Sequence, residues 1–600
     1  MAAYNAPVRE IAFALNQFAN IAKMSELPEF EDATPDMVEV ILDEAAKLAR
    51  DVIAPLNHTG DIEGAVLENG VVRVPEGFAD AWKQYSEGGW AGLAFAPEIG
   101  GQGLPMSLSM AMLEIWSAAN MSFAMCPMLN QGAIEAIKHH GSENLKATYL
   151  EKMVSGQWVG TMNLTEPNAG SDLSVLRSRA TPNSDGSYRI KGSKIFISFG
   201  DHEMTENIVH LVLARTPDSP AGSRGISLFI VPKYLVNEDG SLGKRNDVRC
   251  VSLEGKMGIH ASPTCVMAFG DDDDCIGFLV GDENKGLANM FTMMNNERLG
   301  VGVQGVAIGD RAFQKALEYA SDRKQGKPLR RDGNSDPSII EHADVRRMLM
   351  TMKSQVEAVR ALVYLTAGHI DAADHSPNEG ERQTSADLVE ILTPVAKAWS
   401  TDVGCEVASL GVQVHGGLGF VEETGAAQYF RDARIAPIYE GTNGIQAMDL
   451  VLRKLPMKDG QVVRDFLSSM KSVDELLGTS GIKELESIRA PLAAGIEALS
   501  NGTEWMLSRY AQTPNACAAG ASPYLRMFGL VTGGYLLAKA ALAAVNQSEN
   551  GGSEDEFHKS RIAIAQFYAN QILPQALGLI GAVMSGEEIL YTLSQEQLAI

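Results

Sequence analysis

Apolar side chains recur at intervals of three and four along residues 37–50, and charged residues fill most of the other positions. This period predicts an amphipathic helix, and it extends, with glycine-rich interruptions, from about residue 35 to 160. It returns near Gly286 and is clearest over residues 303–319 and 345–367. Two helical regions are therefore expected, one on each side of a segment with a different pattern.

That intervening segment, residues 161–280, holds short runs of β-branched and aliphatic residues separated by Gly, Pro, Asp and Ser. Residues 188–198 and 208–214 are the clearest runs, and each predicts a strand. We therefore expect a small β domain between the helical regions, and an α+β fold.

A further helical region follows Leu455. About 140 residues rich in Ala and Leu are interrupted by the polar segment 546–556, which we expect to be a flexible connection. Between Pro456 and Ile600, 10 Lys and Arg stand against 15 Asp and Glu, so this region is acidic.

The length of 600 residues exceeds what one hydrophobic core organises, so three or more packed parts are expected. In chain order, we expect an N-terminal extension, an N-terminal helical domain, a middle β domain, a helical bundle and an additional helical domain. Their predicted bounds are residues 1–34, 35–160, 161–280, 281–455 and 456–600.

Composition narrows the classes of function. The formal net charge of −25 opposes nonspecific binding to nucleic acid, which relies on Lys and Arg. We find no run apolar enough to span a bilayer, no secretory signal pattern at the N-terminus, and no CxxC pair or zinc-like cluster among the six cysteines. We expect a cytoplasmic protein with free thiols and no metal site, which binds neither nucleic acid nor a membrane.

One carboxylate stands out in the segment 431–446. Glu440 is set among glycines and backbone donors, with few other acids nearby. A carboxylate that loses its water becomes a stronger base and can remove a proton from carbon, provided that the resulting enolate is stabilised. The alternative is an ordinary helix-capping turn, because residues 441–443 precede an apolar run that can start a helix.

A second constellation lies at the entrance to the β domain. Residues 161–172 combine hydroxyls, an amide and a glycine in one short loop, which can hydrogen-bond a flat heteroaromatic ring. The alternative is a polar β-turn, which residues 166–170 would also form.

Both segments, in this order and on opposite sides of the β domain, resemble the acyl-CoA dehydrogenase family. The resemblance covers about residues 35–455 and includes residues 256–264 and 295–298. It implies an N-terminal helical domain, a β-barrel-like middle domain and a C-terminal helical bundle, followed here by an extra C-terminal helical domain. The additions at both ends resemble a longer bacterial subfamily.

The resemblance implies a reaction. In the family, the residue at the position of Glu440 removes the α-proton of an acyl thioester while the β-hydrogen leaves as hydride to FAD, which gives a trans-2-enoyl-CoA. The backbone N–H of this residue and a ribityl hydroxyl of FAD hold the thioester oxygen. The family positions predict FAD contacts for Met162, Leu164, Thr165, Gly170, Ser171, Phe196, Ser198, Arg323, Gln413, Gly416, Gly417, Thr442 and Asn443. Acyl-CoA contacts are predicted for Ser171, Asn295, Arg298 and Gly441.

Some matches depart from the family pattern. Phe196 and Ser198 stand where the family has Trp and Thr against the flavin, so stacking and a hydrogen bond are expected as substitutes. A buried strand pair is the alternative. The Arg323 guanidinium suits the FAD pyrophosphate of a neighbouring subunit, but its segment is one residue shorter than usual, which puts Gln325 in doubt. We expect His415 to be structural.

Partners and substrate also follow from the resemblance. FAD contacts from a neighbouring subunit imply a homodimer, and the family normally passes electrons to an electron-transfer flavoprotein. The expected substrate is 3-methylmercaptopropionyl-CoA, which belongs to dimethylsulfoniopropionate catabolism, or a straight short- or medium-chain acyl-CoA. Two alternatives stay open. One is a DNA-associated flavoprotein relative, which the acidic C-terminal region and Glu440 disfavour, and the other is an acyl-CoA oxidase.

Overall fold

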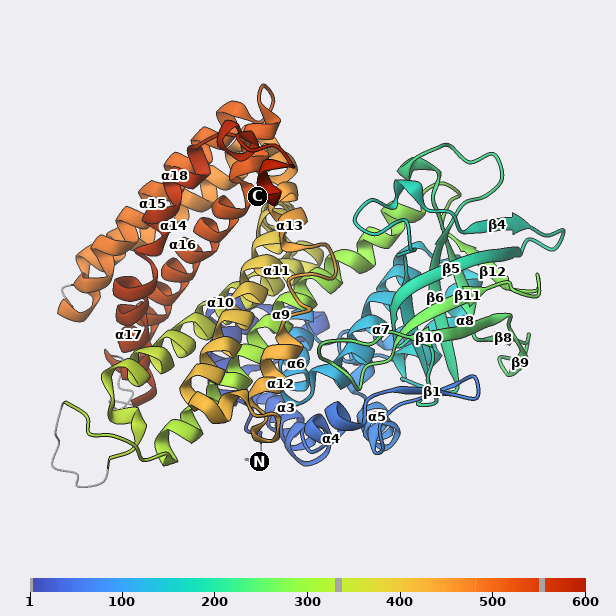
Figure 1. Cartoon of the computed structure of the whole chain (residues 1–600), viewed down its shortest axis with the longest axis horizontal. Helices are drawn as coiled ribbons and strands as arrows, with labels where there is room; N and C mark the ends of the chain where they lie inside the picture. Colours follow the sequence, from blue (N-terminus) through green and yellow to red (C-terminus); the bar gives the residue numbers. More distant parts are fainter. Residues whose placement is uncertain (1–3, 330–336, 481, 550–555) are drawn as a thin grey trace. The chain divides into compact units, whose positions relative to one another are not determined.

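The computed structural model describes residues 4–329, 337–480, 482–549 and 556–600, and it divides into two compact units (Figure 1). Apart from the first residues of the chain, the sheet unit contains Ser25–Gly300 and the helical unit contains Arg9–Met24 and Val301–Ile600. The boundary falls inside α9, a helix over Gly286–Asp322.

Helices form the first part of the sheet unit. Their bounds are Pro35–Leu48 (α3), Leu56–Glu63 (α4), Phe78–Glu87 (α5), Met106–Ala119 (α6), Met121–His140 (α7) and Glu143–Val154 (α8). The first of them confirms the helix expected over residues 37–50. Thr34 caps it by accepting a hydrogen bond from Met37 N, and a π-helix continues it over Ala49–Ile53.

A hairpin interrupts these helices where the sequence pattern predicted helix alone. Its strands are β1 (Val66–Glu68) and β2 (Val71–Arg73), which pair antiparallel. Asn69 and Gly70 form the turn with left-handed φ angles of 52° and 79°, as a two-residue Asn-Gly hairpin turn requires. Strands of three residues are too short to establish an alternating period.

An eight-stranded sheet forms the second part of the unit (Figure 1). The strand order is β10-β11-β5-β12-β7-β6-β3, with β4 paired to β5. β3 and β6 are parallel, and the other neighbours are antiparallel. The bounds are Trp158–Asn163 (β3), Arg179–Pro182 (β4), Tyr188–Ser198 (β5), Asn207–Ala214 (β6), Ser227–Pro232 (β7), Val248–Leu253 (β10), Thr264–Phe269 (β11) and Ile276–Val280 (β12). β5 and β6 confirm the two strands expected from the pattern. A separate ribbon pairs β8 (Tyr234–Val236) with β9 (Leu242–Arg245).

Apolar side chains form a core on each face of the sheet. Every residue of β6 is buried, and its side chains alternate between the two cores because successive residues of a strand point to opposite faces. Leu211 and Leu213 belong to the core that includes Ile134 of α7, whereas Val212 belongs to the core that includes Phe229 of β7. The sheet is therefore packed on both faces at β6, which pairs with β3, the strand that carries Met162.

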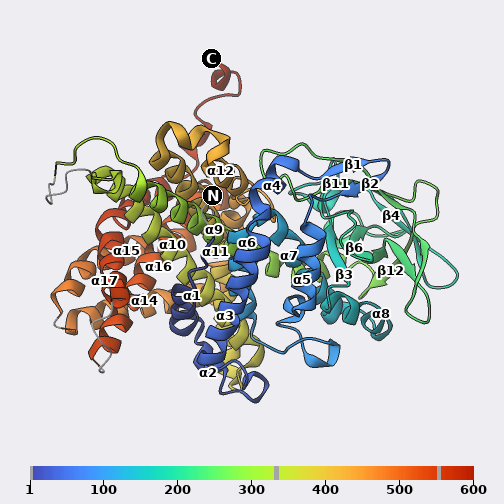
Figure 2. The ribbon, with the colours of Figure 1, turned by 90° about the horizontal axis from the view of Figure 1, so that it is seen from below.

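Helices make up the helical unit. Their bounds are Val8–Ala14 (α1), Ile21–Met24 (α2), Ala343–His375 (α10), Glu379–His415 (α11), Ala426–Ala433 (α12), Asn443–Asp449 (α13), Gln461–Thr479 (α14), Lys483–Arg509 (α15), Pro514–Glu549 (α16), Glu556–Phe567 (α17) and Gln575–Met584 (α18). α9 and α10 confirm the helices expected over residues 303–319 and 345–367. α16 packs against α10, α15, α17 and α18 (Figures 1 and 2).

The helix α16 corrects one expectation. Its segment Pro514–Asn546 is long enough and, with a mean hydropathy of 1.6, apolar enough to span a membrane, whereas we expected no such run. Because 83% of its most apolar window is buried inside the protein, core packing accounts for its composition. The connection expected over residues 546–556 is helical up to Glu549, and residues 550–555 lie outside the described residues.

A buried ionic network joins three helices of this unit. Lys353 on α10 lies 2.9 Å from Glu357 and 3.2 Å from Glu10 of α1, and Arg561 of α17 pairs with Glu357. Burial alone would raise the pKa of Glu357, but Lys353 and Arg561 hold it well below its ordinary value. The N-terminal extension and the additional C-terminal helices are thus both tied to α10.

Candidate active site

The predicted flavin loop leaves the end of β3 and returns along β5. Met162 lies in β3, and Leu164 follows with a side chain that is only 8% exposed. Thr165 O accepts a hydrogen bond from Ile195 N at 2.9 Å. Glu166 and Ala169 exchange backbone hydrogen bonds of 2.9 and 3.0 Å, which form the expected turn. The loop is therefore tied to β5 before it reaches Gly170 and Ser171.

A buried ion pair fastens this loop. Lys194 donates from Nζ to Glu166 Oε1 at 2.8 Å and to Leu164 O at 3.1 Å, and the side chains of Lys194 and Glu166 are 0% and 3% exposed. Glu166 also accepts from Arg177 N at 2.7 Å and from Ser178 N and Oγ at 3.0 and 2.6 Å. The carboxylate is thus surrounded by donors, as a buried charge requires.

The two partners respond differently to burial. Burial lowers the pKa of Lys194 to about 8, although Glu166 opposes this change. For Glu166, burial would raise the pKa, but Lys194 and the surrounding donors outweigh it and lower the pKa. Near pH 7 both groups are therefore charged. The sequence analysis missed this pair, although a lysine at an inward position of an alternating strand was a signal that would have found it.

Phe196 is presented to solvent by a bulge in β5. Cys265 and Met267 on β11 face Ile197 and Lys194, so β5 has one extra residue in between. Phe196 has a left-handed φ of 60° and is 59% exposed. The buried strand pair that was the alternative therefore does not describe Phe196. An aromatic side chain held in a disfavoured conformation and left exposed is available for stacking.

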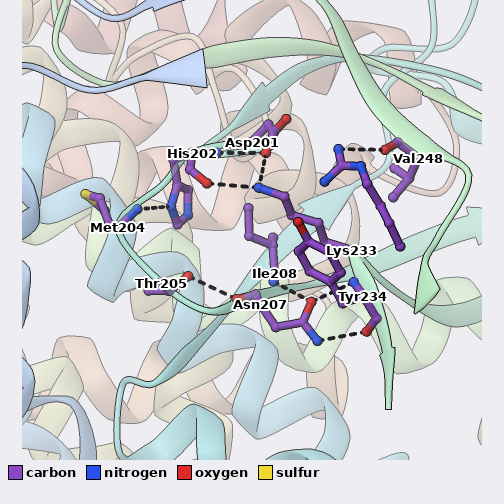
Figure 3. A network of polar contacts seen from close by, with 10 residues as sticks. Asp201, His202, Met204, Thr205, Asn207, Ile208, Lys233, Tyr234 and Val248 are labelled. Atoms are coloured by element: carbon purple, nitrogen blue, oxygen red, sulfur yellow. Dashed lines mark hydrogen bonds and ion pairs between the residues drawn. The ribbon is translucent and has the colours of Figure 1, made fainter. Parts of the chain in front are cut away.

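Ser198 ends β5 and pairs with Thr264 of β11, and Figure 3 shows the polar network that fixes the chain after it. Lys233 donates to Asp201 Oδ1 at 2.6 Å and to the carbonyl of His202 at 3.0 Å. Burial lowers the pKa of His202 to about 3, and Lys233 adds to this effect, so His202 is neutral near pH 7. The network holds the end of β5 in place.

The predicted acyl-CoA residues of α9 lie one helical turn apart. Arg298 donates from Nη1 to Asn295 Oδ1 at 3.3 Å, and its guanidinium lies 6.0 Å from the ring centre of Phe291. Asn295 and Ser171 are both exposed. Within the sheet unit, these positions leave polar side chains accessible to a ligand.

In the helical unit, Glu440 lies in the loop between α12 and α13. It has a left-handed φ of 55°, which is unusual for a residue with a side chain, and Gly441 follows with a φ of 83°. Gln446 donates from Nε2 to Glu440 O at 3.2 Å and to Gly441 O at 3.4 Å. Thr442 Oγ1 accepts from Ile445 N at 3.3 Å and caps α13, so the helix-capping reading of this segment is correct as local structure.

Asn443 is held by α11. Its Nδ2 donates to Asp402 Oδ1 at 2.8 Å and to Ala398 O and Thr401 Oγ1 at 3.0 Å, and its Oδ1 accepts from Lys397 Nζ at 2.9 Å. The side chain thus fastens the Glu440 loop to the rest of the unit. A contact of Asn443 with FAD stays a prediction.

The remaining predicted FAD residues lie near helix ends. Gly416 N donates to Gln413 O at the end of α11, and His415 stacks on Tyr319 with ring centres 4.4 Å apart. Arg323 is exposed beyond the end of α9, and its side chain reaches Gln325 at 3.5 Å. His415 is packed as a structural residue would be.

Each unit, taken by itself, offers groups that suit part of a flat cofactor with a phosphate chain. A Cβ added to Gly170, Gly416 or Gly417 would meet no atom within 4 Å, so the backbone is open to close approach at each of them. Phe196 supplies an exposed ring and Arg323 an exposed guanidinium. Among the described residues, no group of three or more His, Cys, Asp and Glu side chains is arranged to hold a metal ion.

Family models match the chain in the order of these parts. They are the acyl-CoA dehydrogenase N-terminal domain over residues 36–157, middle domain over 161–271 and C-terminal domain over 284–455, and an acetyl-CoA dehydrogenase C-terminal-like domain over 463–594. The chain therefore belongs to the acyl-CoA dehydrogenase family, whose members are oxidoreductases. The expected α+β fold with an additional C-terminal domain is confirmed, and our domain bounds stay a prediction.

Individual relatives extend over nearly the whole chain. The 3-methylmercaptopropionyl-CoA dehydrogenase of Ruegeria pomeroyi is 46% identical over 95% of this chain and 96% of its own length. A butyryl-CoA dehydrogenase of Syntrophomonas wolfei is 36% identical over 96% of each chain. A solved structure of an acyl-CoA dehydrogenase from Bacillus anthracis, complexed with FAD, shares the fold with a TM-score of 0.73 at 22% identity, over 94% of this chain and 89% of that one.

Proposed function

We propose that the protein oxidises an acyl-CoA to a trans-2-enoyl-CoA, with Glu440 as the base that removes the α-proton. The observation that carries this proposal is the conformation of Glu440, a non-glycine residue at a φ of 55° whose carbonyl and the next are both held by Gln446. Such a conformation costs about 1–3 kcal/mol, persists only where surrounding contacts enforce it, and is concentrated at active sites.

FAD is the cofactor that this proposal requires, and when bound it would supply the acceptor for the β-hydrogen, which leaves as hydride. The flavin would be held by Phe196 and Ser198, together with Met162, Leu164, Thr165, Gly170 and Ser171. The pyrophosphate would be held by Arg323. The proposed contacts with FAD are completed by Gln413, Gly416, Gly417, Thr442 and Asn443. Their exposed ring, guanidinium and open glycines support the assignment.

The chain's own groups supply the remaining chemistry. The Glu440 carboxylate takes the α-proton, and its backbone N–H donates to the thioester oxygen, which stabilises the developing enolate. The proposed contacts with the acyl-CoA are those of Asn295, Arg298, Ser171 and Gly441. The accessible polar side chains of α9 support this role.

The proposed substrate is 3-methylmercaptopropionyl-CoA, or else a straight short- or medium-chain acyl-CoA. The first choice rests on 46% identity to the Ruegeria pomeroyi enzyme, and the second on 36% identity to the Syntrophomonas wolfei butyryl-CoA dehydrogenase. We further propose a cytoplasmic homodimer that passes electrons to an electron-transfer flavoprotein. Light scattering that shows a monomer or a stable tetramer would contradict the homodimer.

Anaerobic mixing of the FAD-loaded protein with a panel of acyl-CoAs tests the reaction, since flavin reduction bleaches its visible absorbance. We expect bleaching by the wild type and a rate lower by about 10²–10⁴-fold in Glu440→Gln, because general-base catalysis contributes this much. The matched control is Glu423→Gln, an exposed acid before α12, which should keep the rate.

Other outcomes would favour the alternative functions or remove the role of Glu440. Bound FAD that no thioester bleaches would favour the DNA-associated alternative, and hydrogen peroxide formed under air at the rate of turnover would favour an oxidase. Bleaching at the wild-type rate by Glu440→Gln would remove Glu440 from its proposed role.

A further inference from the structure

A lysine of α11 reaches the loop that carries Glu440. The Lys397 side chain is fully buried, and its Nζ donates to Gly441 O and to Asn443 Oδ1, both at 2.9 Å. Its neighbours Ala396 and Ala398 on α11 are also fully buried. Burying an ammonium is costly unless hydrogen bonds or opposite charges compensate for it, and the two bonds of Lys397 to this loop contribute to that compensation.

These two bonds hold the chain immediately after the candidate base. Gly441 O belongs to the peptide that follows Glu440, and Asn443 lies three residues after it. Gln446 donates to Glu440 O and also to Gly441 O, and Asn443 N donates to Pro437 O at 3.0 Å. The left-handed φ of Glu440 is therefore maintained by contacts of its neighbours.

We propose that Lys397 is a positioning residue, which sets the placement of the Glu440 carboxylate by fixing the carbonyl of Gly441 and the amide of Asn443. This inference rests on the proposed function. Lys397 donates to the backbone and to a side-chain amide, and thus acts on the reaction through the loop. Proton transfer from carbon is sensitive to such placement, since a displacement of about 1 Å costs about 10²-fold in rate.

The test compares Lys397→Met with Lys353→Met in the FAD-loaded full chain. Lys353 is a second largely buried lysine of the same unit, 18% exposed, whose partners Glu10 and Glu357 lie outside the Glu440 loop. For each variant, one measures FAD content, the thermal midpoint, KM, and the anaerobic bleaching rate at saturating acyl-CoA.

We expect Lys397→Met to bleach at least about 10-fold more slowly than wild type per bound FAD and at saturating acyl-CoA, which is a larger change than that in KM or in FAD content. Lys353→Met should lower the thermal midpoint and keep the bleaching rate per bound FAD. Lys397→Gln, which keeps one amide donor for Gly441 O, should bleach at an intermediate rate, and it decides the question if Lys397→Met does not fold.

Two results would overturn the inference. One is a folded Lys397 variant that bleaches at the wild-type rate, and the other is a loss of rate in Lys353→Met equal to that in Lys397→Met, which would indicate general destabilisation. Glu440→Gln separates this failure from that of the proposed function. If Glu440→Gln stops bleaching and Lys397→Met does not slow it, only the positioning role is lost.

Discussion

Each unit contains a fully buried lysine that donates to a loop with candidate site residues, but the two lysines meet different partners. In the sheet unit, Lys194 holds the flavin loop through the carboxylate of Glu166 and the carbonyl of Leu164. In the helical unit, Lys397 holds the Glu440 loop through a backbone carbonyl and the neutral amide of Asn443. One attachment includes an ion pair, and the other uses neutral oxygens.

This difference decides what each lysine contributes. The Lys194–Glu166 pair brings two opposite charges into the core, so either charge without the other would destabilise the folded protein. The two bonds of Lys397 to the loop end on neutral acceptors, which lose a donor when it is removed. Burial raises the pKa of Asp402 and Lys397 opposes this change, but Asn443 Nδ2 still donates to that carboxylate when Lys397 is removed. We therefore expect the first lysine to matter most for stability and the second for rate.

The largest expected effect is that of Lys194→Met. It leaves the Glu166 carboxylate, 3% exposed, without its cation, and should lower the free energy of unfolding by about 3–5 kcal/mol. Lys397→Met should cost less, about 1–3 kcal/mol, because neutral oxygens lose their donor. Urea unfolding followed by circular dichroism measures both.

The double variant Lys194→Met/Glu166→Gln checks this reason. Removing the orphaned charge should recover much of the stability lost in the single variant. If the double variant were no more stable than Lys194→Met, or if the two lysine variants cost the same, the contrast between charged and neutral partners would not hold.

The sequence predicted long elements well and short ones poorly. β5 has the predicted bounds of 188–198, because its run is long enough to establish a pattern. The hairpin of β1 and β2 was missed, although Asn69-Gly70 was a signal for it. The helix α16 was not expected to be of membrane length, although its segment Pro514–Asn546 has a mean hydropathy of 1.6.

The candidate site was predictable where a motif is contiguous in sequence. The Glu440 loop and the flavin loop are each one short segment, whereas the lysines that hold them are 44 residues before Gly441 and 28 residues after Glu166. The pattern of residues within a short segment of sequence does not relate positions that lie so far apart in the chain. Lys397 in particular lies in the segment 391–401 of α11, where every residue is buried, so no period along the helix marks it and only the structure shows its contacts.

Phe196→Ala tests the proposed stacking of a side chain of the sheet unit on the flavin. Phe196 is 59% exposed, so its loss should change the stability of the FAD-free protein by less than about 0.5 kcal/mol. FAD affinity should fall by about two- to tenfold, because an aromatic contact contributes about 0.5–1.5 kcal/mol. Fluorescence titration with FAD measures this loss. Phe196→Trp, which restores the residue usual in the family, should keep the affinity, and equal weakening by both substitutions would argue against stacking.

The smallest expected effect is the pH dependence of the Lys194–Glu166 pair. The pKa of Glu166 is lowered in the folded protein by Lys194 and its other donors, which outweigh burial, so its stabilisation is complete well above the ordinary carboxyl pKa of about 4.3 and is lost as pH falls toward the folded pKa. At pH 4 the unfolded chain already binds the proton, which should raise the unfolding constant of the wild type about threefold through this group. The double variant Lys194→Met/Glu166→Gln has neither charge to titrate. The difference in unfolding free energy between wild type and this double variant should therefore shrink between pH 7 and pH 4, and a difference that stays constant would show that Glu166 does not titrate with a lowered pKa.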